Sequence, residues 1–154
     1  MTPRLVRHTR SGTLVPLAVI VTLTLTTAFI HSTLGGLLFT LNAIGYATLA
    51  ALLIVTSAIS SPFVHRFRWA PRVALGGYTL ATIGGYLVIG PYFLLGWMTK
   101  AIEVVLLAGL AVLVRRDHGG VRGLVAEARA SVSWAIRSVR RMAPDGPEVA
   151  PREA

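Results

Sequence analysis

The sequence has no cysteine, a single lysine and only six acidic residues among 154. Without cysteine, the chain forms no disulfide, thiolate metal site or cysteine nucleophile. Charged residues make up 14% of the chain, against about 25% in soluble domains, whereas hydrophobic residues make up 54%. The net charge of +9 lies beside hydrophobic segments, so it favours a membrane role over a nucleic-acid partner.

Charged residues are missing from two long stretches of the chain. No Lys, Arg, Asp or Glu occurs at residues 11–65, and only Lys100 and Glu103 occur at residues 73–114. A helix needs about 20 apolar residues to cross a hydrocarbon core roughly 30 Å thick. Since a helix rises about 1.5 Å per residue, each stretch is too long for a single span and must fold back.

Residues that favour turns divide these two stretches. The first stretch is broken by the polar, glycine-containing residues 31–36 and ends at Ser60-Ser61-Pro62, and the second is broken at Gly90-Pro91. The sequence therefore predicts an all-α polytopic membrane protein, a bundle of four transmembrane helices over residues 13–116. The expected spans are about 14–30, 37–59, 72–89 and 93–114, between an N-terminal tail at 1–12 and a tail helix at 117–142, and residues 143–154 are predicted to be disordered.

The positive charges predict an orientation. Fourteen of the 15 Lys and Arg residues lie in the N-terminal tail, after the second span or after the fourth span. The positive-inside rule places these segments in the cytoplasm and leaves Lys100 near the other side. We therefore expect a multi-pass plasma-membrane protein with both termini cytoplasmic. A competing interpretation makes residues 1–30 a signal peptide, but no clear Ala-x-Ala cleavage site follows.

Five polar residues are expected in the outer half of the membrane. The helical rise places Asn42, Tyr86 and Glu103 roughly 10 to 12 Å below the outer surface, with His31 and Lys100 above them. An acidic group at this depth is costly and is by default a candidate functional site. Lys100 and Glu103 are spaced i, i+3, so they share a helix face.

Two hypotheses for these five residues remain open. In the first, Lys100 extends outward toward the membrane surface and pairs with Glu103, while Asn42 and Tyr86 tie helices together. In the second, Glu103 serves a proton or cation path, or the residues line a polar pocket that opens outward. In both cases we expect Glu103 to face the bundle interior, within reach of a polar group from the second or third span.

The sequence offers little for catalysis or for metal binding. One His and one Glu in the spans are too few ligands for a metal site. No nucleophile elbow, Walker loop, HExxH motif or dinucleotide fingerprint occurs in the sequence. We therefore expect no cofactor and no enzymatic activity.

The predicted tail helix is amphipathic. Over residues 121–142 the apolar positions fall on one face at the helical period. The arginines that lie off this face are Arg122, Arg129, Arg137, Arg140 and Arg141. This pattern is typical of helices that bind anionic inner-leaflet lipids, and docking on the cytoplasmic loops of the bundle is an equal alternative.

Small residues recur in the third predicted span. Gly77 and Ala81 form a small-xxx-small pair, with further glycines at Gly76, Gly84 and Gly85. Such pairs let two helices approach closely. We expect them to serve packing within the bundle, with a homodimer through this helix or an unknown membrane protein partner as the alternative.

Three short segments carry a family resemblance. The segments are His31-Ser-Thr-Leu-Gly-Gly, Leu41-Asn-Ala-Ile-Gly-Tyr46 and Lys100-Ala-Ile-Glu103. Over residues 14–114 the chain resembles a group of small, uncharacterised four-helix membrane proteins of actinobacteria and archaea, a resemblance that implies no activity. Its size is also similar to that of small multidrug-resistance transporters, whose essential glutamate lies in the first helix, where this chain has no acid.

The expected function is that of a non-enzymatic accessory, scaffold or interaction subunit of the membrane. The alternative is a small proton- or cation-coupled transporter that uses Glu103. The two hypotheses differ in whether Glu103 is needed for activity or only for stability.

Overall fold

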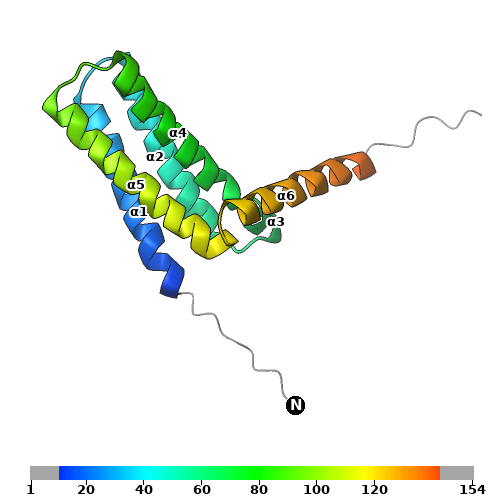
Figure 1. Cartoon of the computed structure of the whole chain (residues 1–154). Helices are drawn as coiled ribbons and strands as arrows, with labels where there is room; N and C mark the ends of the chain where they lie inside the picture. Colours follow the sequence, from blue (N-terminus) through cyan, green and yellow to red (C-terminus); the bar gives the residue numbers. More distant parts are fainter. Residues whose placement is uncertain (1–10, 143–154) are drawn as a thin grey trace, which may run out of the picture.

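The computed structural model describes residues 11–142, and six helices follow one another along this part of the chain (Figure 1). They are α1 (Ser11–Thr33), α2 (Leu37–Ala58), α3 (Pro62–Arg66), α4 (Trp69–Ile89), α5 (Leu94–His118) and α6 (Val121–Met142). Four of them, α1, α2, α4 and α5, are long and apolar enough to cross a membrane. The predicted all-α class with four such helices is confirmed. Of the tails predicted at 1–12 and 143–154, residues 1–10 and 143–154 lie outside the described residues, and residues 11 and 12 belong to α1.

The first helix is longer than expected. It continues to Thr33 instead of ending near residue 30. The hydroxyls of Ser32 and Thr33 donate to carbonyl oxygens one turn back, both at 2.7 Å, which lets polar residues remain helical. The reversal is therefore confined to residues 34–36. Gly35 and Gly36 make it with φ angles of 70° and 83°, in the left-handed region that glycine favours.

The segment after α2 was expected to be a loop, but it contains the short helix α3. Ser61 is extended, as a residue before proline prefers to be, and Pro62 occupies the first helical position. The next helix, α4, then begins at Trp69, three residues earlier than predicted. At the same end of the bundle, α5 continues to His118 and ends at Gly119, whose φ is 68°.

The four long helices pack side by side around one apolar core. Helix α1 packs against α2 and α5, and α4 packs against the same two helices (Figure 1). The buried core is made of Ile20, Ala28, Tyr46, Leu53, Leu75, Leu106, Leu110 and Leu113. Many large apolar side chains remain on the outside, including Phe29, Leu38, Leu80, Val88 and Val104. Exposed apolar surface of this extent is typical of proteins that face a membrane or a partner.

The glycines of α4 divide into two groups. A Cβ atom at Gly76 would lie 3.2 Å from Leu110 of α5, so this glycine serves close packing within the bundle. Gly77, Gly84 and Gly85 have open space at the corresponding position. Packing within the bundle therefore accounts for Gly76 but for none of these three.

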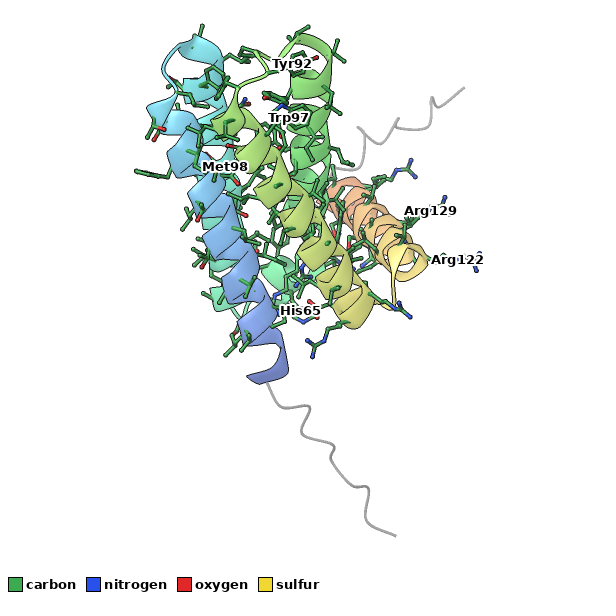
Figure 2. All side chains as sticks on the ribbon, turned by 60° about the vertical axis from the view of Figure 1, so that its left-hand side comes forward. His65, Tyr92, Trp97, Met98, Arg122 and Arg129 are labelled. Atoms are coloured by element: carbon green, nitrogen blue, oxygen red, sulfur yellow. The ribbon has the colours of Figure 1, made fainter. Side chains whose placement is uncertain are left out.

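The two ends of the bundle differ. The connections at residues 34–36 and 90–93 lie together at one end, which we call the turn end, and α3 lies at the other, which we call the α3 end (Figure 1). Tyr92 and Trp97 lie at the turn end and His65 at the α3 end (Figure 2). From the α3 end, α6 projects sideways from the bundle (Figure 1).

One face of α6 is fastened to the bundle. Ser131 is 1% exposed, and its hydroxyl donates to the carbonyl oxygen of Arg66 at 2.8 Å. The Arg66 guanidinium lies 4.7 Å from the ring centre of Trp134, which also packs against Phe63. These contacts hold α6 against α3.

Candidate functional site

A buried ion pair lies on α5, in the half of the helix nearer the turn end. The ammonium of Lys100 donates to Oε2 of Glu103 at 2.6 Å. Lys100 is 7% exposed and Glu103 is 0% exposed. Lys100 was expected to extend outward, but its ammonium turns inward, because Glu103 and the Thr82 carbonyl accept its hydrogen bonds there. The i, i+3 spacing that placed both residues on one helix face also brings their charges together.

The neighbouring helix α4 contributes Thr82 to this pair. Thr82 Oγ1 lies 3.1 Å from Glu103 Oε2, and its carbonyl oxygen accepts from Lys100 at 3.3 Å. The hydroxyl of Tyr46, from α2, lies 2.7 Å from Thr82 Oγ1. If Tyr46 donates to Thr82, Thr82 can donate to the carboxylate. A polar chain therefore runs from α2 through α4 to the ion pair on α5.

The expected position of Glu103 is confirmed, since it is 0% exposed and lies within reach of Thr82, a polar residue of the third span, whereas Asn42 and Tyr86 make other contacts. Asn42 Oδ1 accepts from the Tyr78 hydroxyl at 3.0 Å, and Tyr86 donates to the carbonyl of Phe93 at 3.3 Å. Neither reaches the carboxylate. Thr82 reaches it instead, because it lies one helical turn before Tyr86 on the face of α4 that meets α5.

The second carboxylate oxygen of Glu103 is left without a partner. Within residues 11–142, Oε1 is buried and accepts no hydrogen bond. A buried neutral acceptor without a hydrogen bond costs about 1–3 kcal/mol, and a charged acceptor costs more. Oε1 is therefore the atom of this cluster that is best placed to take a proton, a water molecule or a cation.

Four of the five predicted residues line one cavity at the turn end. The turn-end cavity measures about 270 Å³ and is bordered by His31, Asn42, Tyr86 and Lys100, with Glu103 behind Lys100. Its other walls are mainly apolar or aromatic. They are Leu34, Leu38, Phe39, Tyr78, Ala81, Thr82, Gly85, Ile89, Gly90, Pro91, Phe93, Gly96 and Thr99.

The side chain of His31 has a defined hydrogen-bonding role. Its Nδ1 lies 2.9 Å from the carbonyl oxygen of Thr27, which can only accept, so Nδ1 carries a proton. In the neutral ring, Nε2 is then an acceptor. Its ring lies 5.7 Å from that of Tyr46.

A second polar cluster, which the sequence did not predict, lies at the α3 end around the buried side chain of Arg72. Arg72 of α4 donates to Asp117 at 2.7 Å and to Nε2 of His118 at 2.9 Å, both on α5. Because a guanidinium only donates, Nε2 accepts and Nδ1–H donates to Glu127 of α6 at 2.5 Å. In the sequence these charges were expected only to flank the spans, and no motif indicates that they meet.

The α3-end cluster borders a cavity of its own. The α3-end cavity measures about 310 Å³ and is lined by Leu14, Leu17, Ser57, His65, Arg68, Arg72, Asp117, His118 and Glu127. Arg68 also caps α2, donating to the carbonyl oxygens of Thr56 and Ser57 at 2.9 and 3.3 Å. Across the described part of the chain, no group of three or more His, Asp or Glu side chains is arranged to hold a metal ion.

No protein-family model, curated protein or solved structure matches the chain. The four-helix resemblance seen in the short sequence motifs therefore stays an expectation. The candidate sites on this chain are the two polar clusters, the cavities beside them and the exposed faces of the helices.

Proposed function

We propose that this protein is a multi-pass plasma-membrane protein with four spans and both termini in the cytoplasm. The four apolar helices and their exposed apolar side chains support insertion. Arginines at the α3 end support its placement on the cytoplasmic side. Tyr92 and Trp97 at the turn end suit the opposite interface, where amphipathic rings are enriched (Figure 2).

Within the membrane we propose a non-enzymatic interaction role, as an accessory or scaffold subunit. The observation that supports this role is the pair of open faces on α6. One face of α6 is fastened to α3, while a second, apolar face is open. The exposed apolar residues are Val121, Val125, Val132, Ile136 and Val139. A third face carries arginines, of which Arg122 and Arg129 project away from the bundle (Figure 2).

The occupant that fits both open faces of α6 is the anionic inner leaflet. Arg122, Arg129, Arg137, Arg140 and Arg141 are exposed, and each basic group near an anionic surface contributes about 1 kcal/mol. The apolar face contributes by burial at the headgroup boundary. Because α5 and α3 already hold α6 at the end of the spans, lipid contact would fix its direction as an arm along the membrane.

Single-cysteine labelling tests this arrangement cleanly, since the chain has no cysteine of its own. An environment-sensitive fluorophore at Val132→Cys on the apolar face is compared with one at Ala130→Cys, which is exposed on another face. In nanodiscs with anionic lipid, we expect lipid-bound quenchers to quench the label at position 132 and not at 130. Equal, water-like emission from both labels would contradict the proposal.

A small proton- or cation-coupled carrier is the second candidate, and Glu103 favours it. Its unpartnered Oε1 lies behind Lys100, which borders the turn-end cavity. In proteoliposomes loaded with a pH-sensitive dye, a carrier should lose its proton flux in Glu103→Gln and keep it in the control Glu127→Gln. Wild-type flux indistinguishable from empty vesicles would count against the carrier.

The glycines of α4 that have open space beside them favour a second copy of this chain as the partner, in a homodimer through α4. Gly77 and Gly84 are spaced by two turns on one face of α4, and both have open space beside them. Disulfide trapping of a Gly84→Cys variant in native membranes tests it. Absence of a crosslinked dimer, with efficient labelling of the same thiol, would argue for a monomer.

A further inference from the structure

The turn-end cavity presents hydrogen-bond donors that the described residues do not use. Lys100 has three N–H donors, and two of them are taken by Glu103 Oε2 and the Thr82 carbonyl. Asn42 accepts from Tyr78 through its oxygen, while its amide nitrogen makes no hydrogen bond within residues 11–142. These unused donors favour a ligand whose polar end accepts hydrogen bonds.

The rest of the wall favours an apolar or aromatic ligand body. Phe39, Tyr86 and Phe93 contribute rings to the cavity, and Leu38 and Ile89 contribute aliphatic side chains. At about 270 Å³ the cavity is slightly below the range of roughly 300–1,000 Å³ usual for drug-sized ligands. The ligand is therefore small, with an apolar body and one acceptor head.

We propose that the turn-end cavity binds a small monocarboxylic acid with an apolar body, and that Glu103 takes up a proton when it binds. The ligand carboxylate replaces Glu103 as the partner of Lys100. No bond to carbon forms or breaks. One proton passes from the outer water to Glu103, so the site, neutral as an ion pair before binding, stays neutral with the anion bound.

The charge balance explains why a proton must accompany the anion. Two carboxylates beside a single ammonium would leave one buried negative charge unpaired, which is costly away from water. Glu103 Oε1, which has no hydrogen-bond partner among residues 11–142, can receive the proton without breaking a hydrogen bond. The net charge of the site therefore changes as it would if the undissociated acid bound, which is not at all.

The other titratable groups that face the pair come from every helix around it. They are His31 from α1, Tyr46 from α2, and Tyr78 and Tyr86 from α4, with Lys100 beside Glu103 on α5. Of these, only His31 is of a residue type whose ordinary pKa lies near neutral pH. His31→Asn therefore serves as the control for Glu103→Gln.

This inference extends the carrier candidate but concerns binding, so it can be tested without transport. The probe is benzoate, with uncharged benzamide of the same shape as the control. Titration calorimetry uses the full-length protein in mild detergent, in buffers of different ionisation enthalpy, to count protons. Wild type should bind benzoate with uptake of a proton and bind benzamide about 10- to 100-fold more weakly, as expected for loss of a charged hydrogen bond.

Variants locate the site and the proton. Glu103→Gln should bind benzoate without proton uptake. In His31→Asn, which changes the cavity lining, each benzoate that binds should still bring one proton with it. Gly85→Leu fills the open space at the cavity wall and should abolish binding, while Gly84→Leu, on the same helix but outside the lining, should retain it. If Lys100→Met does not fold, the uncharged double variant Lys100→Met/Glu103→Gln should fold and fail to bind benzoate.

Three results would overturn the proposal. They are equal affinity for benzoate and benzamide, benzoate binding by wild type without proton uptake, and equal binding by the Gly84 and Gly85 variants. Binding with no proton flux in proteoliposomes would instead leave the site standing and remove the carrier candidate.

Discussion

Removing the ammonium of Lys100 tests how strongly the buried pair is coupled. The Nζ–Oε2 distance is 2.6 Å, and the side chains are 8% and 0% exposed, so water cannot replace the lost partner. In Lys100→Met, Glu103 keeps only its contact with Thr82. Breaking a buried pair in this way costs about 3–5 kcal/mol, because one charge stays buried and uncompensated.

The double variant Lys100→Met/Glu103→Leu removes both charges from the same space. Replacing a buried pair by apolar residues of similar volume is often neutral or stabilising by about 1–4 kcal/mol. We therefore expect the double variant to be at least about 3 kcal/mol more stable than Lys100→Met alone. The single variant Glu103→Leu completes a double-mutant cycle. It loses the hydrogen bond from Thr82 to Glu103, as the double variant does, so this loss cancels in the comparison.

The assay is reversible unfolding in mild detergent, followed by circular dichroism on all four proteins. A coupling energy of several kcal/mol is expected from the cycle. Additive effects, with the double variant as unstable as the sum of the single ones, would refute the idea that Lys100 and Glu103 depend on each other.

Four further variants probe the bundle and the attachment of α6. Tyr46→Phe removes the hydroxyl that meets Thr82 and should cost about 0.5–1.5 kcal/mol in the same unfolding assay. Gly36→Ala should destabilise by about 1 kcal/mol, because φ is 83° there, whereas Gly84→Ala, inside a helix with open space, should stabilise by about 0.4–1 kcal/mol. Ser131→Ala should loosen α6 without unfolding the bundle, seen as faster amide exchange confined to α6, and unchanged exchange there would contradict the attachment.

The sequence predicts the long helices well because their signals are strong. Uncharged stretches interrupted by Gly35-Gly36 and Gly90-Pro91 leave few other ways to fold. The ends of the helices are predicted less well. The hydroxyls of Ser32 and Thr33 donate to carbonyl oxygens within α1, so the helix continues past residue 30, where the turn was expected. Helix α3 is only five residues long, too short to show a periodic pattern.

The site was predicted in part. The i, i+3 spacing brought Lys100 and Glu103 together, and depth along the helices placed them among polar residues, but depth alone does not say which residues of α4 face α5. Thr82 was missed because a threonine in an apolar helix usually bonds its own backbone and gives no sign of a longer-range partner. Arg72 was likewise taken for a flanking charge, although it is 8% exposed.

The two polar clusters together constrain how α4 and α5 can move. Thr82 meets Lys100 and Glu103 near the turn end, and Arg72 meets Asp117 near the α3 end, so polar contacts clamp the same two helices at both ends. A carrier that opens alternately to the two sides must release one clamp while keeping the other. A scaffold has no such need and keeps both. The distance between α4 and α5 at each end, measured with paired labels before and after adding benzoate, therefore separates the two functions by a physical criterion.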